Sequence, residues 1–171
     1  MNRYVFAIAA LSTAVVASSV FAQEFKGGDI VIEKPFARAT PKGAEVGGAY
    51  FTVRNNGAKP DRLTGGTADF AGVEIHQMKM DNGVMSMSAL PKGLNIPAHT
   101  TIRLAPGGYH VMFTHLKKPL VKGNKITATM NFENAGPIVV EFPVEGLGAM
   151  GEAPSGDAKG HMMKDMGDKK M

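Results

Sequence analysis

After its first 22 residues, this chain is divided by turn signals into short segments, and none of these carries a long helical period. The turn signals lie at 55–57, 82–83, 91–93, 106–108 and 122–124. Many of the segments between them are rich in Val, Ile, Thr and Phe, which favour strands. We expect strands at 29–36, 49–54, 73–80, 84–90, 100–104, 109–116, 125–132 and 138–144. The pattern predicts an all-β domain, either an antiparallel β-sandwich or a small Greek-key barrel, with seven to eight strands.

The two ends of the chain differ in composition from this middle part. Residues 1–22 combine the positive charge of Arg3, an apolar run and the sequence Val-Phe-Ala at 20–22, a pattern typical of a signal peptide. Residues 146–171 are rich in Gly, Met, Lys and Asp and contain no β-branched residue, which predicts a disordered tail. We therefore expect an exported, periplasmic protein with its folded domain at 23–145 and no stable membrane insertion after cleavage.

The chain contains no cysteine, which excludes disulfides, thiolate catalysis and thiolate metal sites. It contains 12 methionines, of which four lie between positions 78 and 87 and five between 150 and 171. A soft-metal site would therefore have to use thioethers and imidazoles. The net charge of +4 is spread over loops and the tail, so nucleic-acid binding is not expected.

The pair Asn82-Gly83 is the strongest local signal, because it favours a two-residue hairpin turn with positive φ at both positions. In that register Met80 faces Met85, Met78 faces Met87, and His76 faces residue 89. Side chains alternate along a strand, so His76 and the four methionines 78, 80, 85 and 87 are expected on one face.

A second pair of possible ligands lies in the segment 107–113. His110 and Met112 share one face of the expected strand, while Tyr109, Val111 and Phe113 share the opposite face and suit a core. Bringing this pair onto the hairpin face gives a site of two imidazoles and two thioethers. Such a neutral, soft donor set selects Cu(I) over Zn²⁺, Ca²⁺ or Mg²⁺. The candidate ligands are His76, Met87, His110 and Met112.

These residues and their surroundings resemble the PCu(A)C family of periplasmic copper chaperones, which is marked by a His, a later Met and then a His-x-Met pair. Ten residues separate His76 from Met87, as in the family, and twenty-two separate Met87 from His110, one more than the family pattern has. Met85 is therefore an alternative to Met87. The resemblance covers 28–144 and includes Asp-Asn-Gly-Val-Met at 81–85, Leu-Asn-Ile-Pro at 94–97, Pro-Gly-Gly-Tyr-His at 106–110 and Lys-Lys-Pro-Leu at 117–120.

The resemblance implies a cupredoxin-like β-sandwich and a chaperone, not an enzyme, that delivers Cu(I) to the copper centres of respiratory cytochrome oxidase. The implied partners are the copper subunit of that oxidase and a Sco-type copper protein, and we expect a monomer. A periplasmic copper-sequestering protein is the alternative, because the tail offers further donors that could also serve Cu(II). These tail donors are His161, Met162, Met163, Met166 and Met171.

Other residues of these types are not expected to bind metal. His99 should be exposed, His115 should point away from His110, and Met130 should belong to the core. Met78 and Met80 share the ligand face, where they could shield the metal or line its access path. Glu74 shares that face as well, and the sequence gives it no role.

Overall fold

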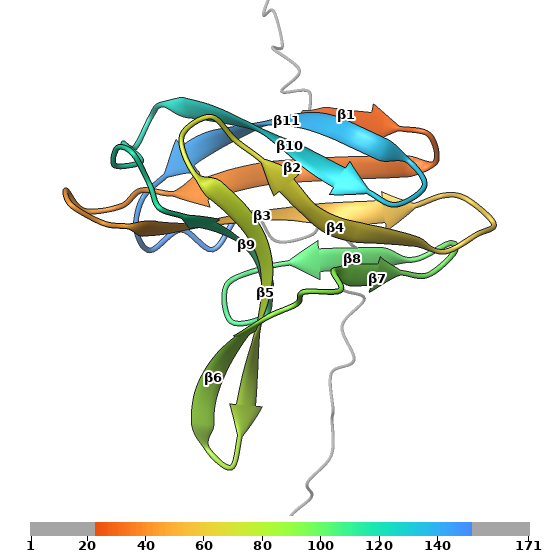
Figure 1. The fold of residues 1–171 in the computed structure, drawn as a ribbon, viewed down its shortest axis with the longest axis horizontal. Coiled ribbons are helices and arrows are strands. Elements are labelled where there is room, and N and C mark those ends of the chain that lie inside the picture. The colour runs from red at the N-terminus through yellow and green to blue at the C-terminus, as the bar shows by residue number, and fades with distance from the viewer. Residues whose placement is uncertain (1–22, 152–171) are drawn as a thin grey trace, which may run out of the picture.

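The computed structural model describes residues 23–151, and this part of the chain is all β (Figure 1). Its eleven strands are β1 (Glu24–Gly27), β2 (Ile30–Arg38), β3 (Val46–Asn55), β4 (Asp61–Thr67), β5 (Gly72–Asp81), β6 (Val84–Ala89), β7 (Leu94–Ile96), β8 (Thr101–Leu104), β9 (Tyr109–Thr114), β10 (Lys125–Phe132) and β11 (Gly136–Glu145). No helix long and apolar enough to cross a membrane occurs between residues 23 and 151. The predicted signal peptide at 1–22 and residues 152–171 of the predicted tail lie outside the described residues.

The strands form one continuous sheet in the order β6-β5-β9-β3-β2-β11-β10-β4-β7, with β1 added beside β2 and β8 beside β3. The expectation of an all-β fold is confirmed. The sheet is mixed and not wholly antiparallel, because β11 runs parallel to β2 through the pairs Val144–Ala37 and Glu145–Arg38. The last strand follows β10 through a tight hairpin, and this hairpin brings it back along β2 in the same direction as β2.

The number of strands exceeds the seven to eight expected, because three strands carry weak sequence signals. β4 begins with the charged pair Asp61-Arg62 and contains Gly65-Gly66, both unusual in strands. β7 is only three residues long. β1 precedes the first expected strand and pairs with β2 across the Gly28-Asp29 turn. Strand pairing within the folded sheet, and not local preference, stabilises these segments.

The core is formed by apolar side chains that alternate with outward-facing residues along the strands. Phe142 of β11 lies with its ring centroid 6.2 Å from that of Phe51 of β3 and 6.2 Å from that of Phe113 of β9. Phe113 and Val111 are fully buried, so the prediction that this parity of β9 faces the core is confirmed. His110 and Met112 therefore lie on the opposite face of the same strand.

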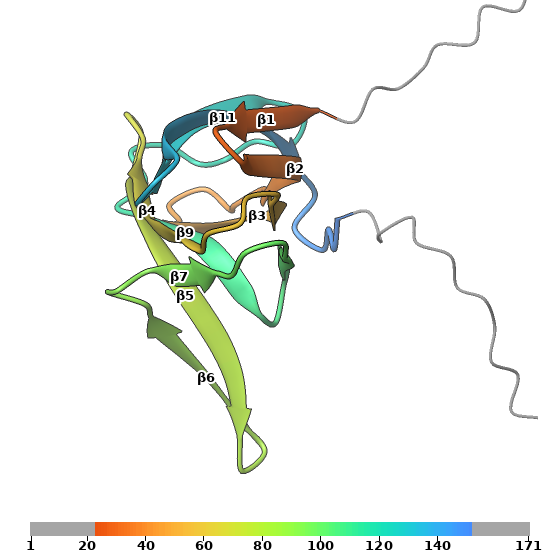
Figure 2. The same cartoon turned by 90° about the vertical axis from the view of Figure 1, so that its right-hand side faces the viewer.

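The hairpin of β5 and β6 extends well beyond the body of the domain (Figures 1 and 2). Its turn has φ of 47° at Asn82 and 80° at Gly83, as the two-residue turn requires. The observed pairs include Met80–Met85, Met78–Met87 and His76–Ala89, so the predicted register is confirmed.

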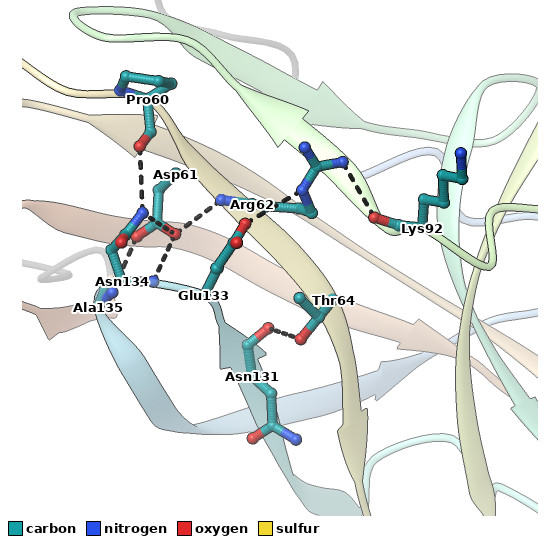
Figure 3. Close-up of polar contacts among 9 residues, drawn as sticks. All are labelled: Pro60, Asp61, Arg62, Thr64, Lys92, Asn131, Glu133, Asn134 and Ala135. Atoms are coloured by element: carbon teal, nitrogen blue, oxygen red, sulfur yellow. Dashed lines mark hydrogen bonds and ion pairs between the residues drawn. The ribbon is translucent and has the colours of Figure 1, made fainter.

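A buried carboxylate joins β4 to the turn between β10 and β11 (Figure 3). Asp61 is only 6% exposed, and its oxygens accept hydrogen bonds from the backbone N–H groups of Arg62, Asn134 and Ala135 at 2.7, 2.9 and 2.9 Å. The exposed pair between Arg62 Nε and Glu133 Oε2, at 3.2 Å, lies beside this cluster. The carboxylate thus fixes β4, which has little local strand preference, in the sheet.

We expect Asp61→Ala to lower the free energy of unfolding by about 3 kcal/mol, because it leaves backbone donors without their charged acceptor. Glu133→Gln should change it by less than about 1 kcal/mol, since exposed ion pairs contribute little. Urea unfolding followed by far-ultraviolet circular dichroism measures both values. Equal effects of the two substitutions would contradict the structural role given to Asp61.

Candidate metal centre

Three neighbouring strands bring the predicted ligands onto one face of the sheet. β5 lies between β6 and β9, so its residues have partners on both sides. His76 of β5 is directly opposite His110 of β9, and their ring centroids are 5.8 Å apart. Met78 of β5 is directly opposite Met87 of β6. The long-range pairing of β5 with β9 is the step that unites the two separate His/Met clusters of the sequence.

A cavity of about 320 Å³ opens on this face, and Met78, Met87, His110 and Met112 line it. His76 does not line the cavity but lies next to His110, with its side chain 13% exposed. The predicted ligands thus form an imidazole pair and an adjoining thioether-lined cavity.

His76 is held in one orientation by a carboxylate. Its Nε2 lies 2.8 Å from Oε2 of Glu74. A carboxylate only accepts hydrogen bonds, so Nε2 of His76 is the donor, and in the neutral ring Nδ1 then carries the lone pair. Nδ1 is buried and has no hydrogen-bond partner among residues 23–151. A buried acceptor without a partner is costly, and a bound ligand would satisfy it.

The orientation of His110 is fixed by the backbone. This residue is 5% exposed, and its Nδ1 lies 3.1 Å from the carbonyl oxygen of Gly108. The Nδ1–H group donates a hydrogen bond to this carbonyl, so the lone pair of the neutral ring is on Nε2. The pKa of His110 is lowered, mainly because the ring is buried. The nearby His76 also lowers this pKa, and the hydrogen bond to Gly108 raises it but does not cancel the decrease. The ring is therefore neutral at neutral pH and available as a ligand.

Residues of β2 and β3, among them Arg38 and Tyr50, line the cavity on the side of β9 away from the hairpin. Tyr50 stacks on Phe36 with centroids 5.0 Å apart, and its ring lies 6.3 Å from that of His110. The guanidinium of Arg38 lies over Tyr50 at 5.5 Å, and its Nε donates to the carbonyl of Ala149 at 2.8 Å. Residues 146–151 of the predicted tail are therefore held against the domain, beside the cavity.

Sequence reasoning missed the roles of Glu74, Tyr50 and Arg38. Glu74 is two residues before His76 on the same strand face, and this spacing was the available signal. Tyr50 and Arg38 reach the site only through the pairing of β2, β3 and β9, which no local pattern indicates.

The remaining candidate residues lie away from this cavity or outside the described part. Met85 is paired with Met80 nearer the hairpin turn and is 46% exposed. His99 is exposed and Met130 is fully buried in the core, as expected, and His115 is exposed just beyond the end of β9. The tail candidates His161, Met162, Met163, Met166 and Met171 lie outside the described residues.

A model of the family described as "Putative lipoprotein LpqE-like" matches residues 30–144. The chain belongs to this LpqE-like family. A protein of Leifsonia xyli subsp. xyli named "Putative lipoprotein Lxx21020" is 32% identical over 124 residues, which cover 72% of this chain and 74% of that protein. The match spans the whole sheet from β2 to β11, so the fold and the candidate site both lie within the shared region.

Solved structures similar to this LpqE-like chain are PCuAC domains, so the predicted family resemblance is confirmed. The copper-bound PCuAC domain from PmoF2 is 30% identical with a TM-score of 0.62, over 72% of this chain and 98% of that one. The structure of CuI-DR1885 from Deinococcus radiodurans is 25% identical with a TM-score of 0.54, over 75% of this chain and 83% of that one.

We expect the two imidazoles of this LpqE-like protein to be opposite tautomers without metal: protonated at Nε2 in His76 and at Nδ1 in His110. Long-range proton–nitrogen correlation spectra distinguish the two forms. Glu74→Ala should leave His76 as a mixture of tautomers, because the carboxylate that accepts its proton is gone. His110 is the internal control and should keep its tautomer. An unchanged His76 spectrum would contradict the role of Glu74.

Proposed function

We propose that this protein is a periplasmic chaperone that binds Cu(I) through His76, Met87, His110 and Met112. The observation that carries this proposal is the buried, unpartnered Nδ1 of His76 beside the neutral ring of His110. Two oriented imidazoles thus lie side by side, and that of His110 lines a cavity to which three methionines also contribute. The copper found in the related PmoF2 and DR1885 domains supports the same cargo here.

The chemistry of the donors favours Cu(I) over harder ions. Thioether sulfur is soft and uncharged, and imidazole is borderline. No group of three or more His, Asp or Glu side chains able to hold a metal occurs within residues 23–151. A hard divalent ion would thus lack the carboxylate and carbonyl donors that it prefers.

Met87 is the better candidate than Met85 for the thioether contributed by β6. Met87 lines the cavity together with His110 and Met112, whereas Met85 lies two residues farther toward the hairpin turn. Two residues span about 7 Å along a strand, so Met85 begins that much farther from the imidazole pair than Met87.

A carrier must also release its ion. Met87 is 51% exposed, so a partner docked on this face can reach one ligand directly and replace the protein's donors one at a time. The partners we propose are the copper subunit of cytochrome oxidase and a Sco-type copper protein. The pattern at 1–22 supports export to the periplasm, where these partners are found. With no Cys in the chain, the lipid attachment suggested by the family description has no thiol to use here.

Copper sequestration is the second candidate, because five of the 12 methionines lie between positions 150 and 171. A sequestering protein binds several ions and retains them, whereas a chaperone gives up its ion to a partner. Stoichiometry and transfer therefore separate the two functions.

The first test is anaerobic Cu(I) titration against a competing chromophoric chelator. Glu74→Ala should weaken binding of the first equivalent by about 10- to 100-fold, as loss of an outer-shell partner of a ligating histidine typically does. His110→Ala and Met87→Leu should weaken it at least as much, and Met85→Leu should have little effect. Unaltered affinity in His110→Ala would overturn the assignment of the site.

The second test compares the protein with a form that ends at Gly151. The shortened form should keep the first equivalent of Cu(I) and pass it to a soluble fragment carrying an oxidase copper site. Absorbance and mass spectrometry of the separated proteins follow the transfer. If the shortened form loses the first equivalent, or if the intact protein transfers none, the sequestration function is favoured.

A further inference from the structure

The projecting hairpin has two chemically different faces. One face carries Met78, Met80, Met85 and Met87, which we call the methionine face. The opposite face carries mainly polar side chains, Gln77, Lys79, Ser86 and Ser88. Figures 1 and 2 show that the outer part of the hairpin extends beyond the body of the domain, and Met80, Met85 and Met87 are all exposed.

These methionines are not explained by packing. Met80 is 65% exposed, and all six residues of β6 are exposed. An exposed strand that needed only strand preference would carry Val, Ile, Thr or Tyr, because Met gains little there. What distinguishes Met from those residues is a polarisable sulfur on a flexible side chain.

The backbone hydrogen bonds determine which cross-strand pairs are closest. Leu90 N donates to Ile75 O at 2.7 Å, and Met78 N donates to Gly108 O, beside β9, at 3.0 Å. Even-numbered residues of β5 thus direct their backbone polar groups away from β6. Met78–Met87 and Met80–Met85 are therefore non-hydrogen-bonded pairs, in which side chains approach most closely. Cβ atoms in such pairs lie about 5 Å apart, so the two sulfurs of each pair can reach one ion.

Exposure rises outward along β5, from His76 through half-buried Met78 to exposed Met80. His76 and His110 lie at the inner end, Met78 and Met87 come next, and the pair of Met80 and Met85 lies outermost. Successive pairs are two residues apart, which is about 7 Å along a strand. An ion that moves this distance can bind a thioether of the next pair before it releases the last thioether of the previous pair.

We propose that Met80 and Met85 form a second, weaker Cu(I) site and that copper passes between it and the inner ligands through Met78. This inference rests on the proposed function of Cu(I) transport. Each step is a ligand exchange in which one copper–sulfur bond forms as another breaks, and the copper remains Cu(I). Two neutral thioethers without an imidazole hold the ion less tightly than the inner set. The ion at the tip is therefore the one offered to a partner.

Methyl spectra of the protein labelled with ¹³C-methyl methionine, recorded during anaerobic Cu(I) addition, test this proposal. The methyl signals of Met87 and Met112 should shift with the first equivalent. Those of Met80 and Met85 should shift with later additions, while that of buried Met130 should stay fixed. Signals of Met80 and Met85 that stay unchanged while Met87 and Met112 respond would overturn the second site alone. If none of the four responds, the proposed function fails with it.

Matched variants test passage along the hairpin. Met80→Leu combined with Met85→Leu removes both sulfurs but retains apolar side chains of similar volume. This variant should keep the first-equivalent affinity and transfer copper more slowly to a chelator. Ser86→Ala combined with Ser88→Ala changes the opposite face and should behave like the unaltered protein. Transfer by the Leu variant at the unaltered rate would overturn passage through the tip.

Discussion

The candidate metal centre depends on the antiparallel pairing of β5 with β9. This pairing sets His76 directly opposite His110, although thirty-three residues separate them in the sequence. The core side of β9 fixes its register, because Val111 and Phe113 are fully buried and a shift by one residue would exchange the two faces. The ligands thus owe their position to apolar residues that never touch the metal.

The chemistry of the candidate site depends on how the positive charge of a bound ion is balanced in a partly buried environment. All four proposed ligands are neutral, so a bound Cu(I) ion keeps its positive charge. Glu74 holds the Nε2 proton of His76 and supplies a negative charge one imidazole away from the ion. Tyr50, which stacks on Phe36, lines the cavity beside His110. The proposed donor set is therefore soft and uncharged, with one carboxylate beside it.

Local sequence signals predicted the structure correctly where a single local preference, such as a turn type or an alternation of side chains, determines it. Asn82-Gly83 predicted the hairpin turn and its register, and the alternation of His110 and Met112 with Val111 and Phe113 predicted the two faces of β9. These signals failed where the structure depends on distant partners. β4 is held by strand pairing and by the buried carboxylate of Asp61, and neither shows in its glycine-rich sequence. Tyr50 acquires its role only through the strand pairing that brings it beside His110.

The exposure of the methionine face makes the protein vulnerable to oxidants. Met80, Met85 and Met87 are each about half exposed or more, whereas Met130 is fully buried. Oxidation of an exposed thioether gives a sulfoxide, which is polar and bulkier and no longer offers a soft sulfur donor. Peroxide that reached a loaded protein would thus damage the outer ligands first and leave the core intact. Methionine sulfoxide reductases reverse this lesion, so repair of the hairpin would restore the proposed copper transport without new synthesis of the chain.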